Sequence, residues 1–299
     1  MLNNSNEKMA TFATMSEEAQ IHVDKCTIQS TSNQDYSWYH VEGNKTWIVV
    51  FDGHGNHKEI IPTVDLITWL KNYNWKQLMK TRVNRNPIHV LEDVIAEEYS
   101  STKGIGAAIS ITEIVDNKYV TIWWKGDAST KLFDITDGNI NIIAETKIPS
   151  AEEELVRLAN QNISVITKEG WQVCGLTETE LTMRKNPIYV FEGGDKINMS
   201  QSIGHDGITG VVDQKIEYTL NDDHDYRIWA GSDGIWDIAG LDNEVVLNKF
   251  WIYSAEQMAE WAVNQWKRKW VYVWYGTRVS DQVIGDCDDV TCVVWSKTS

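Results

Sequence analysis

The sequence predicts an α+β fold in which antiparallel strands dominate and helices pack against them. Short runs of β-branched and aromatic residues end at turn pairs such as Asp-Gly, which is the pattern of antiparallel hairpins. Longer segments carry apolar residues at helical spacing, with charged residues between them. With 299 residues, 42% of them hydrophobic, the chain can bury a substantial core as one large domain or two small ones.

The first part of the chain predicts a hairpin followed by two helices. Residues 1–20 are polar and small, so we expect them to be flexible, with a possible strand after Ile21. Two aromatic-rich runs then surround a Gly-Asn turn, and two segments with a proline near the start show helical spacing. The strands are expected at 36–41 and 47–51, and the helices at 58–80 and 87–100.

The rest of the chain predicts a meander, a helix and a second mixed region. Four strand-like runs are separated by tight turns, as in successive hairpins, and the next helix carries glutamates in its first turn. The stretch 162–200 is too irregular to assign and is treated as an insertion. The expected elements are strands at 107–114, 119–124, 131–135 and 139–142, a helix at 151–161, a strand from 226, helices at 243–252 and 255–270, and a strand at 290–295.

Charge and composition exclude several classes of protein. A formal net charge of −16 argues against nucleic acid or an anionic membrane as a partner, because both attract basic surfaces. The four cysteines form no Cys-x-x-Cys pair, so neither a disulfide framework nor a zinc ribbon is indicated. No apolar segment approaches the roughly 18 residues of a membrane span, and no secretory signal is recognisable. We therefore expect an intracellular, cytoplasmic protein.

Carboxylates stand at the ends of several expected strands. Residues 47–55 run from an apolar strand into Asp52, a glycine and His54, and the Asp-Gly pair alone is typical of a hairpin turn. Asp233 and a glycine repeat this pattern far along the chain, and Asp288 with Asp289 precedes the last strand. Strand ends distant in sequence can be neighbours in a sheet. These acids are therefore candidates for one oxygen-rich site, with Asp35 and Asp127 at its edge.

Such a cluster favours a paired-metal site. Neighbouring carboxylates repel strongly unless cations compensate them, and all-oxygen ligation selects magnesium or manganese over zinc. Two such ions about 3.5 to 4 Å apart can share a hydroxide and clamp phosphate oxygens during in-line attack. His54 suits a general acid that protonates the leaving alcohol, although a histidine packed in a polar turn is the alternative. The residues alone do not decide between Asp288 and Asp289 as a ligand.

Four segments resemble, in order and spacing, the motifs of the metal-dependent serine/threonine protein phosphatases of type 2C. The resemblance extends over nearly the whole chain. Weaker similarities are found at 33–35 (NQD), 104–108 (GIGAA) and 199–204 (MSQSIG). The four main segments are 50–55 (VFDGHG), 125–129 (KGDAS), 230–237 (AGSDGIWD) and 288–294 (DDVTCVV).

The resemblance implies a four-layer α/β/β/α sandwich of two antiparallel sheets flanked by helices, with two or three Mn²⁺ or Mg²⁺ ions at one end between the sheets. Residues 21–299 would form a single phosphatase-like catalytic domain. By this resemblance, Asp52 bridges both main metals, the Gly53 carbonyl adds to one of them, and Asp233 and Asp288 hold the other. Asp35 orients metal-bound water, and His54 is the general acid. Asp127 with Asp233 holds a third metal, and Asp237 lies near that metal.

The implied activity is hydrolysis of phosphoserine and phosphothreonine in proteins by a hydroxide that bridges two metal ions. The expected partner is a phosphorylated protein, and the chain is expected to be a monomer. Gln34 stands where many members of the family have Glu, and Ser30 stands where they have an Arg or Lys that grips phosphate. In the later segment, Gln201 stands at the position of an Arg and His205 at the position of an Asp. A catalytically weak or inactive phosphatase-like regulatory module is therefore an alternative. A two-metal nuclease is a third, which the acidic chain disfavours.

Overall fold

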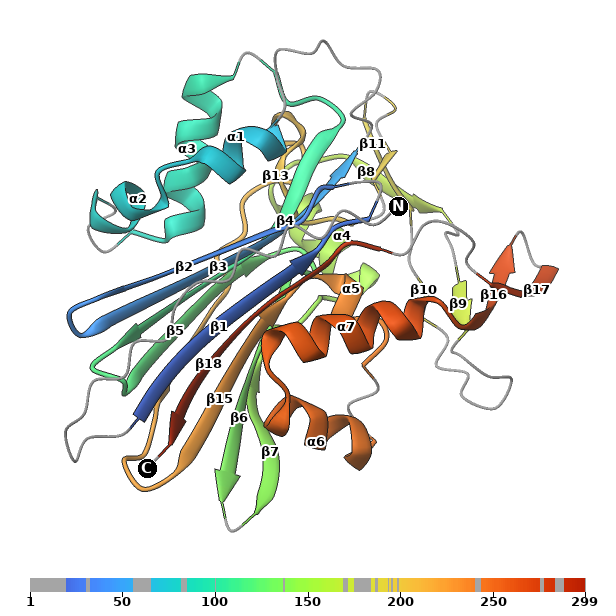
Figure 1. Cartoon of the computed structure of the whole chain (residues 1–299). Helices are drawn as coiled ribbons and strands as arrows, with labels where there is room; N and C mark the ends of the chain where they lie inside the picture. The colour runs from blue at the N-terminus through green and yellow to red at the C-terminus, as the bar shows by residue number, and fades with distance from the viewer. Residues whose placement is uncertain are drawn as a thin grey trace.

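Two antiparallel sheets form the centre of the computed structural model (Figure 1). The five-stranded sheet contains, in spatial order, β1 (Gln20–Ile28), β18 (Val290–Thr298), β15 (Asp225–Gly231), β6 (Ser129–Thr136) and β7 (Asn139–Glu145). The six-stranded sheet contains, in spatial order, β14 (Lys215–Thr219), β5 (Tyr119–Lys125), β4 (Ile105–Val115), β3 (Lys45–Gly55) and β2 (Tyr36–Glu42), and β13 (Ile203–Gly204) pairs with β4.

The structure describes most of the chain, including every strand of the two sheets. The expected flexible segment lies outside the described residues except for Gln20. The described residues are 20–30, 33–55, 66–81, 85–99, 101–136, 138–168, 172–174, 184–185, 188–192, 194, 196–197, 199–239, 243–274, 277–282 and 288–298.

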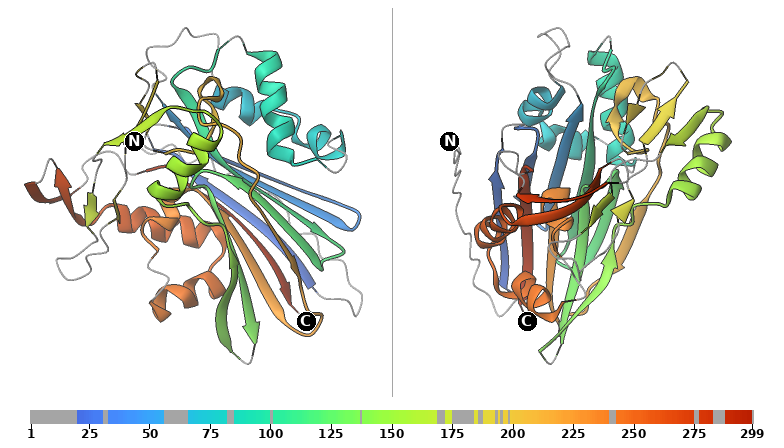
Figure 2. Two further views of the ribbon diagram at one scale, coloured as in Figure 1. Left: turned by 180° about the vertical axis from the view of Figure 1, so that it is seen from behind. Right: turned by 90° about the vertical axis from the view of Figure 1, so that its right-hand side faces the viewer.

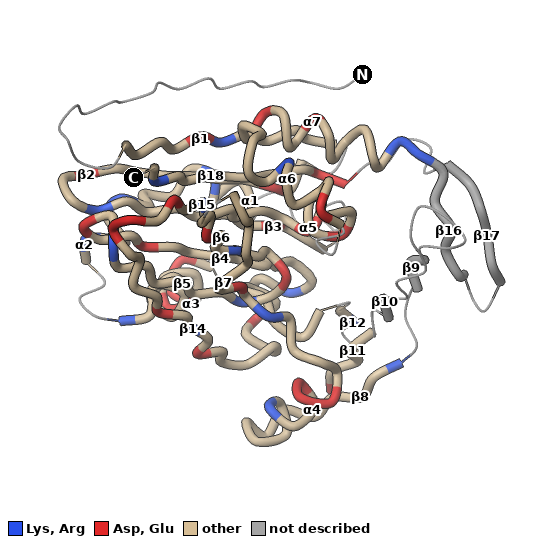
Figure 3. The backbone as a smooth tube through the Cα atoms, turned by 90° about the horizontal axis from the view of Figure 1, so that it is seen from below, with Lys and Arg blue, Asp and Glu red and all other residues tan. Residues whose placement is uncertain are grey.

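Helices cover the outer faces of both sheets (Figures 1 and 2). In Figure 1 these helices lie on opposite sides of the two stacked sheets, so the predicted four-layer α+β fold is confirmed. The six-stranded sheet is covered by α1 (Leu66–Asn72), α2 (Trp75–Thr81) and α3 (Pro87–Glu98), and the five-stranded sheet by α5 (Asp233–Trp236), α6 (Glu244–Ile252) and α7 (Ala255–Trp266). Seen from below, α7 and α4 (Ala151–Asn160) lie at opposite edges of the molecule, with the strands between them (Figure 3).

The three apolar cores of the sandwich, among four in the described part of the chain, follow from the alternation of side chains along the strands. In β3, Ile48 and Val50 face the other sheet, whereas Val49 and Phe51 face the helices. In β15, Ile228 likewise belongs to the core between the sheets, and its neighbours point to α6 and α7. A strand covered on both faces is apolar at every position, which explains why these segments read as continuous hydrophobic runs.

The region 162–200 is described in part. It follows α4 (Ala151–Asn160), which begins at the expected residue and is capped by a capping box between Ser150 and Glu153. A three-stranded sheet contains β12 (Lys196–Ile197), β11 (Ile188–Phe191) and β8 (Val165–Lys168). A four-stranded sheet contains β10 (Arg184–Lys185), β9 (Gln172–Cys174), β16 (Lys269–Trp274) and β17 (Thr277–Gln282).

Three expectations about local structure are wrong. The chain does not turn after Asp52, because β3 continues through Gly55 with Gly53 opposite Ala107 of β4. The expected helix at 58–80 contains two helices in its described part, and Asn74 starts the second by accepting a hydrogen bond from Gln77 N–H. The expected helix at 255–270 ends at Trp266, before a strand.

The expected meander is divided between the two sheets. The β4–β5 hairpin belongs to the six-stranded sheet and the β6–β7 hairpin to the five-stranded sheet. The chain crosses between them at Gly126, which has a left-handed φ of +94°. This crossing places Asp127 between the sheets' ends rather than in an ordinary hairpin. None of the described helices is long and apolar enough to cross a membrane.

The core between the sheets should dominate the stability of the fold. We expect Ile48→Ala to lower the free energy of unfolding by about 2–5 kcal/mol, because Ile48 is fully buried in that core. The matched control is Ile166→Ala in β8, where the side chain is 60% exposed and the loss should stay near ~0.5 kcal/mol. Urea unfolding of both variants measures the difference, and equal losses would contradict this account of the core.

Candidate metal centre

The strand registers bring four aspartates to the same end of the sandwich. Asp35 precedes β2, whose first residue pairs with Phe51, next to Asp52. Asp288 precedes β18, and Gly231 near the end of β15 pairs with Cys292 of β18, so Asp233 lies beside it. Two of the acids therefore come from one sheet and two from the other. The strand ends that carry these four residues are distant in sequence and lie at one end of the sandwich.

Asp52 and Asp233 interact across the two sheets. The backbone N–H of Asp233, at the start of α5, donates a hydrogen bond of 3.4 Å to Oδ2 of Asp52. Desolvation, followed by repulsion from Asp233, Asp35 and Asp127, raises the pKa of Asp52 well above its ordinary value. The half-buried Asp127 therefore also faces this cluster. The Asp52 carboxyl therefore resists ionisation unless positive charge is supplied.

Asp35 is the most buried of the four. Burial raises the pKa of its carboxyl well above the ordinary value, and repulsion from Asp289 and Asp233 adds to the shift, whereas hydrogen bonds with Ser232 and Asp52 lower it. Its Oδ2 atom is buried and has no hydrogen-bond partner among the described residues. A buried carboxylate oxygen in this state lacks the donor or cation that normally compensates it.

Asp288 and Asp289 have different roles, which the sequence could not separate. Asp289 is buried, and its carboxylate accepts hydrogen bonds from the backbone N–H groups of Ser30, Gln34 (2.6 Å) and Asp35 (3.3 Å). It therefore holds the loop before β2 in place. Asp288 is exposed, and its carboxyl is repelled by Asp233 and Asp35. Asp288 is thus the acid of this pair that faces the cluster.

Gly53 occupies a position that no larger residue could take. A Cβ atom at this position would lie 2.4 Å from Cδ1 of Ile67 and 2.8 Å from the Gln34 carbonyl oxygen. The loop before β2 thus packs directly on the β3 backbone at Gly53, whose carbonyl is the predicted metal ligand. Asp237, the last of the predicted residues, is exposed one helical turn after Asp233, to whose carbonyl its N–H donates. It lies at the rim of the cluster.

His54 contacts a second histidine. Its Nε2 atom lies 2.9 Å from Nε2 of His205, and the two rings are stacked. His54 is two residues after Asp52 in β3, so both side chains lie on the same face of the strand. Sequence reasoning noted His205 only as a departure from the type 2C pattern, and no spacing signal linked it to His54.

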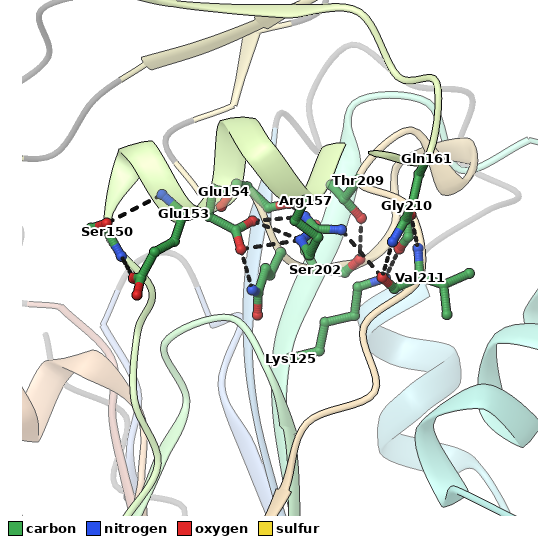
Figure 4. Close-up of polar contacts among 12 residues, drawn as sticks. Lys125, Ser150, Glu153, Glu154, Arg157, Gln161, Ser202, Thr209, Gly210 and Val211 are labelled. Carbon is green, nitrogen blue, oxygen red and sulfur yellow. Dashed lines mark hydrogen bonds and ion pairs between the residues drawn. The ribbon is translucent and has the colours of Figure 1, made fainter. Parts of the chain in front are cut away.

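Gln201, where an Arg would be expected, belongs to a polar network at α4. Figure 4 shows this network around Glu154 and Arg157. Its Nε2 donates a 2.6 Å hydrogen bond to Glu154, which is buried and also paired with Arg157. Burial alone would raise the pKa of Glu154, but hydrogen bonds from Arg157, Ser200 and Gln201 hold it below the ordinary value. Gln201 therefore stabilises the docking of α4.

Lys125, two residues before Asp127, is a buried cation. Lys125 donates to Glu92 of α3 and to the Gly210 carbonyl at 2.7 Å. Burial lowers the pKa of Lys125, and the charge of Glu92 partly restores it. Lys25, the nearest cation to the Ser30 position along the chain, is directed to the Ser37 carbonyl and the Tyr36 ring. The structure thus assigns these two lysines to contacts other than phosphate.

The donor set fits divalent metal ions in its chemistry. Four carboxylates, one with an uncompensated buried oxygen, form an all-oxygen set of high negative charge, which suits Mg²⁺ or Mn²⁺. Within the part of the chain that the structure describes, no three His, Cys, Asp or Glu side chains are already arranged as a metal-binding group. The acids instead interact with one another through hydrogen bonds and repulsion.

Comparison with solved structures identifies the fold. A serine-threonine phosphatase 2C from Toxoplasma gondii superposes with a TM-score of 0.51 at 11% identity, covering 96% of this chain and 97% of its own. The chain has the fold of the type 2C serine/threonine phosphatases. The photosystem II phosphatase PBCP gives a TM-score of 0.51 at 14% identity, covering 93% and 99% of the two chains.

A further likeness is to a longer protein. A Caenorhabditis elegans (C.elegans) sex determining protein superposes with a TM-score of 0.56 at 15% identity, and the match covers 92% of this chain. This chain spans 64% of that protein's length. No family model and no curated protein matches the sequence. The likeness at these identities is therefore one of fold, and it confirms the type 2C resemblance at that level.

The two adjacent acids at the start of β18 should differ in their effect on stability. With a chelator present, Asp289→Ala should lower the free energy of unfolding by about 2–4 kcal/mol, because three backbone N–H groups lose their acceptor. Asp288→Ala, the matched control, should leave it unchanged or raise it by relieving repulsion. Urea unfolding measures both, and a larger loss for Asp288→Ala would reverse the assigned roles.

Stability without metal should fall as the pH rises. Desolvation and repulsion raise the pKa of Asp288 from 3.8 to about 9, and those of Asp35 and Asp52 are also raised. Water screens the exposed Asp288 more than the buried Asp35. These groups bind more protons in the folded state than in the unfolded state, so their contribution to stability is greatest below about pH 4 and declines toward about pH 9.

Unfolding curves at several pH values, with chelator and with excess Mn²⁺, measure this dependence. Other groups contribute equally to both series, and Asp35→Asn should flatten the decline seen in chelator. Mn²⁺ should also flatten it, because the cation compensates the ionised carboxylates in place of protons. A stability that rises with pH across this range in chelator would show that the carboxyls are not held as described.

Proposed function

We propose that this protein is a Mn²⁺- or Mg²⁺-dependent phosphatase that hydrolyses phosphoserine and phosphothreonine in proteins. One observation carries the proposal: four aspartates from separate strand ends converge beside His54 at one end of a type 2C fold. Acids that raise one another's pKa are costly to a protein unless a ligand compensates them, so their convergence supports a metal-dependent function.

Four aspartates and one carbonyl would hold the cations. Asp52, which faces both Asp35 and Asp233, is suited to bridge two ions, with the Gly53 carbonyl beside it. Asp233 and Asp288 lie together on the other sheet, and Asp35 stands between the two groups. Bound divalent ions would supply an activated water and neutralise the phosphate charge. Asp127 with Asp233 would hold a further, weaker ion, and Asp237 would lie near it.

The chain's own residues would carry out the remaining steps. Asp35, whose Oδ2 has no protein donor among the described residues, would orient the attacking water. The oxygen of that water would add to phosphorus as the water loses one proton to solvent. The bond from phosphorus to the serine or threonine oxygen would break, and His54 would give a proton to the departing alcohol. The products are inorganic phosphate and the free hydroxyl, with no phosphate bound to the protein.

A phosphatase-like regulatory module is the second candidate. It is favoured by the state of the positions that would grip phosphate. The Ser30 backbone is bonded to Asp289, and Gln201 is directed to Glu154 instead of the cluster. One of the solved structures described above is that of a sex determining protein, a name that supports this candidate. Retention of the whole acid set with His54 favours the enzyme.

Purified protein should hydrolyse a phosphothreonine peptide in Mn²⁺ or Mg²⁺ and lose this activity on chelation. Asp52→Asn and Asp233→Asn should each lower kcat/KM by roughly 100-fold or more, because each removes a metal ligand charge. The control is Asp93→Asn, which changes an exposed acid of α3 that is paired with Arg85. This variant should keep full activity. The rate of phosphate release measures the activity of the wild type and the three variants.

The same preparations separate the two candidates. Calorimetric titration with Mn²⁺ should show binding that Asp52→Asn weakens. Binding of Mn²⁺ without hydrolysis of any peptide in a phosphopeptide library would favour the regulatory module. Neither binding nor hydrolysis by the folded protein would contradict the metal centre itself.

A further inference from the structure

His205 and His54 form a direct imidazole pair beside the acid cluster. Their Nε2 atoms are 2.9 Å apart, and the ring centroids lie 5.0 Å apart with 23° between the planes. A hydrogen bond between two imidazole Nε2 atoms requires an N–H on one ring and a bare nitrogen on the other. Each ring therefore constrains the tautomer and the orientation of its neighbour.

Glycine makes this approach possible. Gly106 of β4 lies opposite His54 in the β3–β4 ladder and opposite Gly204 in the β4–β13 ladder. A Cβ atom on Gly106 would lie 2.4 Å from both Cδ2 and Nε2 of His205. The ring of His205 thus occupies the space that a side chain at position 106 would fill. Only glycine in β4 lets the ring reach across to His54.

The turn that presents His205 is fixed by a polar clamp. His205 and Asp206 both have left-handed φ angles, of +50° and +51°, which cost free energy in residues other than glycine. The Asp206 carboxylate accepts hydrogen bonds from the Ser101 hydroxyl and the Thr102 N–H, and its own N–H donates to Thr102 Oγ1 at 2.8 Å. These bonds offset the strain and hold His205, itself buried, against His54.

We propose that His205 is a positioning residue for His54, a role that rests on the proposed phosphatase activity. Neutral His205 accepts at its Nε2 the N–H of His54 Nε2. This bond fixes the His54 ring and assigns proton transfer to its Nδ1 atom. When the ester bond breaks, the Nδ1 proton moves to the alcohol oxygen, and His54 keeps the Nε2 proton that it shares with His205.

Two substitutions of His205 distinguish a positioning role from simple packing. His205→Phe retains an aromatic ring of similar size but has no acceptor nitrogen. His205→Gln places an amide oxygen near the position of Nε2, so it can accept the same hydrogen bond. If His205 only fills space, Phe is the better replacement. If it accepts a hydrogen bond from His54, Gln is.

Two substrates with different leaving groups provide the kinetic test in Mn²⁺. A phosphothreonine peptide releases an alkoxide that needs a proton, whereas p-nitrophenyl phosphate releases a stable aryl oxide. We expect His205→Phe to lower kcat on the peptide by roughly 10- to 100-fold, a part of the general-acid contribution, and to change kcat on the aryl phosphate by less than about threefold. His205→Gln should recover most of the peptide rate.

Equal losses on both substrates, or a better rate for Phe than for Gln on the peptide, would overturn the positioning role. A second measurement does not require activity. In ¹⁵N-histidine NMR spectra of the Mg²⁺-loaded wild-type protein, with the His54 signals assigned by their loss in His54→Gln, His54 should carry its proton on Nε2. This tautomer preference should be lost in His205→Phe. A neutral His54 protonated on Nδ1 in the wild type would refute the proposal.

The two readouts also separate this inference from the proposed function. A wild-type protein that hydrolyses neither substrate would refute the phosphatase, and the NMR result would still decide whether His205 sets the tautomer of His54. A wild-type enzyme whose peptide rate is unaffected by His205→Phe would leave the phosphatase intact and remove His205 from its positioning role.

Discussion

Mutual repulsion among the clustered aspartates is the constraint on which this end of the sandwich depends. Desolvation and neighbouring charge raise the pKa of Asp35, Asp52 and Asp288, so the folded chain holds these groups together against their own electrostatics. What holds them is the rest of the fold: strands buried on both faces and a loop secured by backbone hydrogen bonds to Asp289. The stability of the cores is thus partly used to maintain a strained, charged site.

Sequence reasoning succeeded where a local pattern and the tertiary fold agree. The strands around Ile48 and Ile228 are apolar at successive positions because both of their faces are covered, and α3 and α4 carry their own start signals. The gathering of Asp52 and Asp233 was predictable because both follow apolar strands. The assignment of their partner Asp288 came from the type 2C resemblance, since adjacent acids in one turn give no local signal that separates them.

Other features were set by contacts between distant segments. The Asp-Gly pair after Phe51 forms a turn in most local contexts, but here pairing with Ala107 and Ala108 of β4 keeps the chain extended. The crossing at Gly126 depends on which sheet each hairpin joins. The sequence of the hairpins gives no signal for this choice of sheet. The contact of His205 with His54 had no signal in the sequence, because the two residues are 151 positions apart and the glycine that admits the His205 ring belongs to another strand.

The backbone hydrogen bonds accepted by Asp289 also impose an order on assembly. Ser30 and Asp35 are 259 and 254 residues from this carboxylate in the chain, and contacts of such long range form late because loop closure must come first. During synthesis, the segment with Asp35 and Asp52 leaves the ribosome long before its partners exist. The acid cluster is therefore among the last parts of the molecule to take shape, and until then the four carboxyls are ordinary solvated side chains without mutual strain.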